Sequence, residues 1–234
     1  MFSLCADLAL RLVNLLVPPK CANCHAAGKI MCDACREKIE LVIAPYCRIC
    51  GRPSFSRTVC RSCELNPPMV DLIRAATFYI PPVIDFVHQF KYHDQFGLQT
   101  PMSQILIDHW ENLFGACRFD LVVPIPLARV RERTRGYNQA ELLAAPLSHY
   151  LGVPTSKRTL VRVRETVPQA KLSGKDRKKN MKGSFRTRQI DSGIKRVLLV
   201  DDVYTTGATL DAAAEALKSE GVDFVAAYTF ARTL

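Results

Sequence analysis

Four Cys-x-x-Cys pairs lie close together near the start of the chain and constrain its fold more than any other feature. Eight of the ten cysteines form the pairs Cys21/Cys24, Cys32/Cys35, Cys47/Cys50 and Cys60/Cys63. Two thiolates at this spacing converge on one metal ion, and four complete a tetrahedral zinc site. The pairs therefore predict two structural zinc sites, because a segment of about 45 residues is too short to fold by burial alone.

A secreted disulfide scaffold is the main alternative, and the N-terminus argues against it. The first apolar stretch is interrupted by Asp7, Arg11 and Asn14, and no basic residue precedes it. A secretory signal needs a charged start and a clean apolar run. In a reducing compartment, cysteines at this spacing bind metal more often than they form disulfides. We therefore expect a cytoplasmic protein.

The spacing alone leaves two ways to combine the four pairs into two sites. Sequential pairing gives two stacked zinc ribbons, and alternate pairing gives an interleaved cross-brace. Successive pairs are separated by 7, 11 and 9 residues. We predict sequential pairing because it closes the shorter loops at a lower cost in chain entropy.

Three segments follow from these patterns. Residues 1–19 read as an amphipathic helix, residues 20–66 hold the zinc-ribbon module, and residues 67–234 form the main domain. The helix either packs on the rest of the protein or docks to a partner or membrane surface. No segment has the ~20 uninterrupted apolar residues of a transmembrane helix.

Strand and helix patterns alternate through the main domain. The expected strands are 72–79, 119–124, 158–163, 196–201 and 222–229, and the expected helices are 82–91, 98–114, 138–150 and 208–220. This alternation predicts an α/β fold in which helices cover both faces of a mostly parallel sheet. Pro146 should kink or shorten one of the helices.

Positive charge is concentrated in one region of the main domain. The chain has 32 Lys and Arg against 22 Asp and Glu, and residues 118–196 hold 19 of these bases and six of these acids. The excess falls on a loop over residues 129–135 and on the run 158–188. Such a region indicates a phosphate-rich partner: a nucleotide, nucleic acid or anionic lipid.

The most specific motif is a strand followed by two acids and a hydroxyl-rich turn. The apolar residues 197–200 precede Asp201 and Asp202, and Thr-Thr-Gly-Ala-Thr follows at 205–209. Ligands of parallel α/β sheets bind at this end of a strand. Amides at the helix start suit a phosphate, whereas the acids suit sugar hydroxyls, directly or through a divalent cation. The alternative is an ordinary turn with solvated aspartates and Thr caps.

The complete motif resembles the 5-phosphoribosyl-1-diphosphate (PRPP) signature of type I phosphoribosyltransferases. The resemblance implies that the acids contact the ribose 2′ and 3′ hydroxyls, that Mg²⁺ accompanies PRPP, and that the turn holds the 5′-phosphate. The PRPP-binding residues expected from it are Asp201, Asp202, Thr205, Thr206, Gly207, Ala208 and Thr209. Contacts to the diphosphate or to DNA are expected from Arg133, Arg135, Asn138, Gln139, Arg164 and Gln169.

Nearly the whole chain is similar to the ComF family of phosphoribosyltransferase-like competence proteins, which includes GntX. The matching elements are the cysteine pairs, Phe-Lys-Tyr-His at 90–93, Val-Pro-Ile-Pro at 123–126, residues 133–141, the PRPP signature and Ala-Arg-Thr at 231–233. Residues 166–185 look like the loop that closes over PRPP, although a basic loop can also simply bind phosphates. The resemblance implies a double zinc ribbon fused to a type I phosphoribosyltransferase fold.

Three functions are compatible with this resemblance. The first is a competence protein for DNA uptake that binds PRPP and handles single-stranded DNA in the cytoplasm during natural transformation, with Tyr46, Tyr92 or Tyr137 stacking on bases. The second is an active Mg²⁺-dependent phosphoribosyltransferase with a nucleotide- or gluconate-related role. Its catalytic residues are unassigned, and His88, Lys91 and His93 lie in the segment that would cover the acceptor.

The third function is a zinc-ribbon adaptor. It would bind a competence helicase or membrane-associated uptake proteins, and would place the protein peripherally at the inner membrane.

Overall fold

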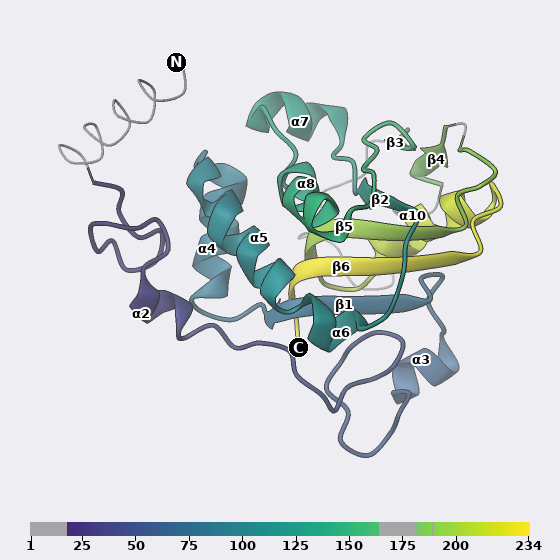
Figure 1. The fold of residues 1–234 in the computed structure, drawn as a ribbon, viewed down its shortest axis with the longest axis horizontal. Coiled ribbons are helices and arrows are strands. Elements are labelled where there is room, and N and C mark those ends of the chain that lie inside the picture. Colours follow the sequence, from purple (N-terminus) through teal and green to yellow (C-terminus); the bar gives the residue numbers. More distant parts are fainter. Residues whose placement is uncertain (1–17, 164–180, 182, 189) are drawn as a thin grey trace.

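A four-stranded parallel sheet forms the centre of the molecule, with the strand order β1-β6-β5-β2 (Figure 1). The structure is a computed structural model that describes residues 18–163, 181, 183–188 and 190–234. The strands are β1 (Leu72–Phe78), β2 (Leu121–Pro124), β5 (Arg196–Tyr204) and β6 (Phe224–Arg232). In the register, Val123 lies opposite Leu199, and Asp201 lies opposite Thr229. The predicted α/β fold with a mostly parallel sheet is confirmed.

Alternate side chains of the strands enter two separate hydrophobic cores, one on each face of the sheet. On β5, Leu198 and Val200 belong to the first core, whereas Val197 and Leu199 belong to the second. All four are fully buried. A parallel strand that is covered on both faces reads as a continuous apolar run, which is why residues 197–200 predict this strand so clearly.

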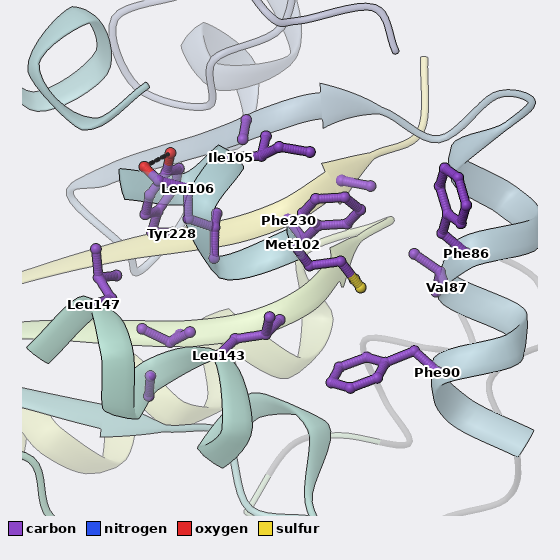
Figure 2. Packing of buried hydrophobic residues seen from close by; sticks show 14 of the residues in the cluster. Phe86, Val87, Phe90, Met102, Ile105, Leu106, Leu143, Leu147, Tyr228 and Phe230 are labelled. Carbon is purple, nitrogen blue, oxygen red and sulfur yellow. Dashed lines mark hydrogen bonds between the residues drawn. The ribbon is translucent and has the colours of Figure 1, made fainter. Parts of the chain in front are cut away.

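Helices from the middle of the chain build the first core. They are α4 (Val83–Tyr92), α5 (Gln99–Asp108), α6 (Trp110–Phe114) and α8 (Gln139–Leu151), with the 3-10 turn η1 (Phe96–Leu98) before α5. Figure 2 shows Phe86 and Phe90 of α4 in this core together with Phe230 of β6. Burying one such side chain contributes about 1.5–3 kcal/mol.

The second core lies beneath α10 (Ala208–Lys218) on the other face. A small antiparallel sheet of β3 (Leu160–Arg162) and β4 (Phe185–Thr187) packs there through Leu160 and Phe185. The strand predicted over residues 158–163 therefore forms, but outside the parallel sheet.

The two cysteine ribbons join different cores. The first ribbon (residues 20–36) contains α2 (Asp33–Arg36), and its Cys21 and Cys35 belong to the first core. The second ribbon (residues 46–65) contains α3 (Arg61–Leu65), and its Cys47 and Cys63 belong to the second core. The connection passes the edge of the sheet, where Val42 N donates to Ala76 O of β1 at 2.9 Å. The ribbons therefore pack against cores that lie on opposite faces of one sheet.

Three elements differ from the prediction for reasons of local packing. The helix expected over 98–114 is divided into α5 and α6 at the buried His109, whose Nε2 lies 2.8 Å from Val42 O. Helix α8 runs through Pro146 to Leu151, so the expected shortening is wrong. Its apolar face is buried, and this burial outweighs the one hydrogen bond that a proline removes.

The third difference concerns residues 129–135, which form helix α7 (Arg129–Arg135) instead of a loop. Gly136 ends α7 with a positive φ of 73° that a glycine tolerates. The N-terminal helix and the loop expected to close over PRPP lie largely outside the described residues.

Candidate phosphoribosyl site

Two adjacent acids stand at the carboxyl end of β5. Asp202 is 7% exposed, and its Oδ1 accepts a hydrogen bond from Lys91 Nζ of α4 at 2.7 Å. Asp201 Oδ1 accepts one from the backbone N–H of Asp202 at 2.9 Å. Burial and the neighbouring Asp202 raise the pKa of Asp201 to about 7. Burial lowers the pKa of Lys91, but the two carboxylates outweigh it and hold that pKa above its usual value.

The turn after these acids brings hydrogen-bond donors to the start of a helix. Gly207 has a φ of 79°, and a Cβ there would lie 3.0 Å from a ring carbon of Tyr204. Helix α10 begins at this glycine without a side-chain cap, so the amides of its first turn lack intrahelical acceptors. Thr206 Oγ1 is buried and has no hydrogen-bond partner among the described residues. Amide donors and a hydroxyl at a helix start suit a bound phosphate.

The acids and the turn face one cleft with a volume of about 1160 Å³. Thr205, Thr206 and Thr209 line it beside Asp201 and Asp202. The other walls come from distant parts of the chain: Lys91, Tyr92, Arg135 and Arg162, and from the second ribbon Arg52 and Ser62. The structure therefore places a zinc ribbon against the predicted sugar-phosphate site.

The residues expected to meet a diphosphate or DNA occupy different environments. Arg135 lines the cleft, with its guanidinium carbon 4.6 Å from the centre of the Tyr92 ring. Its Nη1 donates to Gln139 Oε1 at 3.1 Å. Arg133 is exposed on α7 and does not line the cleft. Arg164 and Gln169 lie outside the described residues.

Asn138 has a structural task at the start of α8. Its Nδ2 donates to Ile125 O at 3.0 Å, and its Oδ1 accepts from Ala140 N at 3.0 Å. Both Asn138 and Gln139 are buried. These two side chains therefore fix the loop and the helix that carry Arg135.

The three tyrosines expected to stack on bases lie in different environments. Tyr92 is 59% exposed and lines the cleft. Tyr137 donates its hydroxyl to Phe90 O, and its ring packs 4.4 Å from that of Phe96. Tyr46 lies beneath the guanidinium of Arg74 at 4.7 Å. Of these three, Tyr92 alone presents a ring to the cleft.

The eight cysteines form two four-sulfur groups, which confirms sequential pairing. The groups are Cys21, Cys24, Cys32, Cys35 and Cys47, Cys50, Cys60, Cys63, and within each the Sγ atoms lie within 4.8 Å of one another. Cys24 and Cys32 Sγ are 3.6 Å apart, and Cys50 and Cys60 Sγ are 3.7 Å apart. Zn–S bonds of about 2.3 Å in a tetrahedron fit this size. Both groups therefore suit structural zinc.

Two family models match the chain. The double zinc ribbon domain matches residues 12–64, and the phosphoribosyl transferase domain matches residues 137–233. Competence protein F of Haemophilus influenzae is 32% identical over 216 residues, which cover 90% of this chain and 93% of that protein. This chain belongs to the ComF family.

Further ComF relatives carry related names. The DNA utilization protein YhgH of Escherichia coli is 30% identical over 228 residues, which cover 94% of this chain and all of that protein. Competence protein ComFC of Bacillus subtilis is 29% identical over 199 residues, which cover 82% of this chain and 79% of that protein. A solved adenine phosphoribosyl transferase from Trypanosoma brucei is more distant, at 14% identity and a TM-score of 0.34 over 58% of this chain and 64% of its own.

Within this ComF protein, buried arginines hold the second ribbon to the sheet. Arg232 is 1% exposed, and its Nη1 donates to Cys50 O at 2.6 Å. Arg74 is also buried, and its Nη2 donates to Arg48 O at 3.0 Å. Both cations lie beside the second sulfur group, where four thiolates around Zn²⁺ would carry a net negative charge.

Sequence reasoning on the ComF site missed the contribution of the second ribbon and of Arg162. The ribbon residues that line the cleft carry no phosphate-binding pattern of their own, and they lie far from β5 in the chain. For Lys91 a partial signal exists, because it lies within Phe-Lys-Tyr-His at 90–93.

None of the helices in the described part of the chain is long and apolar enough to span a membrane.

Proposed function

We propose that this ComF protein binds PRPP, or a phosphoribosyl end of a nucleic acid, in the cleft and handles single-stranded DNA in the cytoplasm. One observation carries the proposal: the acidic pair at the end of β5 and the uncapped start of α10 face the same cleft. The first suits sugar hydroxyls and the second suits a phosphate, so together they suit a sugar phosphate. The names of the relatives for competence and DNA utilization support the DNA role.

The chain's own residues divide the ligand between them. The amides at the start of α10 and the hydroxyl of Thr206 bind the 5′-phosphate, and Asp201 and Asp202 accept from the ribose hydroxyls. Arg135 and Lys91, on the facing helices, meet the negative charge of the diphosphate. Mg²⁺ bound by the two carboxylates, directly or through water, would neutralise the diphosphate further.

The surface around the cleft suits a single-stranded nucleic acid as well as PRPP. The volume of the cleft, about 1160 Å³, is close to the upper limit of roughly 300–1,000 Å³ for small-molecule pockets. Tyr92 offers an exposed ring at its wall, and Arg133 adds an exposed cation on α7. Aromatic rings beside cations are the usual means of binding single strands, and Arg135 of α7 supplies such a cation inside the cleft.

Titration calorimetry with PRPP tests the pocket. We expect the double variant Asp201→Asn, Asp202→Asn to lose PRPP binding. It should keep two zinc ions, because both metal sites consist of cysteines alone. Retained binding in this variant contradicts the assignment. Release of diphosphate, measured with and without single-stranded DNA, then separates ligand binding from phosphoribosyl transfer.

Fluorescence anisotropy with a single-stranded oligonucleotide tests the DNA role. We expect salt-sensitive binding that weakens when Arg133 and Arg135 are both replaced by alanine, since phosphate contacts release counterions. The control replaces Lys29 and Arg36 on the first ribbon, which removes the same charge outside the cleft. Equal affinities of the two double variants contradict a DNA surface at α7.

A further inference from the structure

The ion pair between Lys91 and Asp202 stands out from the other ion pairs among the described residues. Its side chains are 21% and 10% exposed, lower than in the pairs elsewhere on the described chain. It is also the pair whose two members both line the cleft. Lys91 therefore already pairs with Asp202, a carboxylate that the proposed ligand would use.

A ribose ligand competes with Lys91 for Asp202. The carboxylate oxygen Oδ1 already accepts from Lys91 Nζ at 2.7 Å in a poorly hydrated position. A charge-assisted bond of this kind contributes about twice as much as a neutral one, so a hydroxyl alone cannot replace it at no cost. Binding is therefore tighter when the displaced ammonium finds another anion on the ligand.

The diphosphate of PRPP can supply this anion to Lys91, whereas ribose 5-phosphate carries no such group on ribose C1. Lys91, Tyr92 and Arg135 all line the cleft, and the Arg135 guanidinium carbon lies 4.6 Å from the centre of the Tyr92 ring. The 5′-phosphate would lie at a different wall, the turn between β5 and α10. With the 5′-phosphate at that turn and the ribose hydroxyls at Asp202, a group on ribose C1 would face Lys91 and Arg135.

We propose that Lys91 is a transferable counterion that makes the cleft selective for a sugar diphosphate over a sugar monophosphate. It holds Asp202 in the free protein and moves to the diphosphate when PRPP binds, which leaves Asp202 to the ribose hydroxyls. Ribose 5-phosphate has no second anion for Lys91 and so binds against the intact ion pair. The inference rests on the proposed function.

Removing the ammonium should change the two affinities in opposite directions. In Lys91→Met, PRPP loses a partner for its diphosphate, whereas Asp202 becomes a buried carboxylate without a counterion. Hydroxyl donors of ribose 5-phosphate then satisfy that carboxylate without displacing a cation. The ratio of the two dissociation constants, and not activity, is the readout.

Calorimetry with PRPP and ribose 5-phosphate on the full chain provides the test. We expect Lys91→Met to weaken PRPP about tenfold or more, the size of one charged hydrogen bond, and to tighten ribose 5-phosphate at least about threefold. Lys91→Arg should keep the preference for PRPP. The matched control is Lys218→Met, which breaks a Lys–Asp pair of 2.8 Å with 26% and 32% exposure outside the cleft and should change neither affinity.

The outcomes separate this inference from the proposed function. If the wild-type protein binds both ligands and Lys91→Met weakens both or changes neither, the counterion role is wrong and the phosphoribosyl site stands. If the wild-type protein binds neither ligand, the proposed function is wrong and this inference with it. Should Lys91→Met not fold, Lys91→Gln keeps a hydrogen bond to Asp202 without the charge, and the same opposite shifts are required of it.

Discussion

The two zinc ribbons share a ligand pattern but differ in their attachment to the rest of the protein. The first ribbon keeps Cys24 exposed, and its Arg36 reaches Asp108 of α5 through an exposed ion pair of 3.1 Å. The second ribbon buries Cys47, Cys50 and Cys63 and lines the cleft. The shared Cys-x-x-Cys pattern therefore indicates that each ribbon folds on a metal ion, but it does not indicate which ribbon contributes to the site.

The attachment of the second ribbon is made by backbone contacts that leave little room for adjustment. Ile73 N of β1 donates to Ile49 O at 2.7 Å, and Arg232 of β6 donates to Cys50 O. Gly51 lies so close to β1 that a Cβ there would be 2.8 Å from Ile73 O. A change in this ribbon should therefore reach the strands that carry the site.

The largest difference should appear when one zinc ligand is removed from each ribbon. Cys63→Ser should release one zinc ion and weaken PRPP about tenfold or more, because a wall of the cleft loses its position. Cys24→Ser should also release one zinc ion, yet leave the PRPP affinity within about twofold. Metal analysis and calorimetry measure both quantities. Equal losses of affinity in the two variants would contradict the comparison.

The second-largest difference should appear when the arginine that joins each ribbon to the rest of the protein is replaced. Arg232→Met removes a buried charge that donates to Cys50 O and should lower the free energy of unfolding by about 3 kcal/mol. Arg36→Met removes one exposed ion pair and should lower it by less than about 1 kcal/mol. Denaturant titrations monitored by circular dichroism measure both values. A smaller effect at Arg232 than at Arg36 would show that the second ribbon is not held through β6.

The smallest expected difference is in the pH dependence of stability. The pKa of Asp201 is about 7 in the folded protein, against about 4 in an unfolded chain. The folded state then binds this proton more tightly, so the free energy of unfolding should fall as pH rises from about 4 to about 7. Asp201→Asn should flatten that slope, measured by denaturant titration at each pH.

The control for this slope lies on the first ribbon. Asp33 forms an exposed ion pair with Lys29 at 2.7 Å, and Asp33→Asn should keep the wild-type slope. A slope that survives in Asp201→Asn would assign it to another group.

Local patterns in the sequence were sufficient for much of the fold. The buried run at 197–200 predicts β5 because both faces of that strand are covered. The short loops within each ribbon predict sequential pairing of the cysteines, because chain entropy favours the nearest partners. The sequence predicts a loop over residues 129–135 because they follow a strand, yet they form α7.

What the sequence alone determined is the chemistry of each segment: two four-cysteine zinc sites, a strand that ends in two acids, and a turn suited to phosphate. Only the tertiary structure decided which of these segments meet. It joins the two ribbons to cores on opposite faces of the sheet, places the second ribbon at the wall of the cleft, and pairs Lys91 with Asp202. Sequence patterns report interactions between near neighbours, whereas these contacts arise from the packing of strands and helices that are distant in the chain.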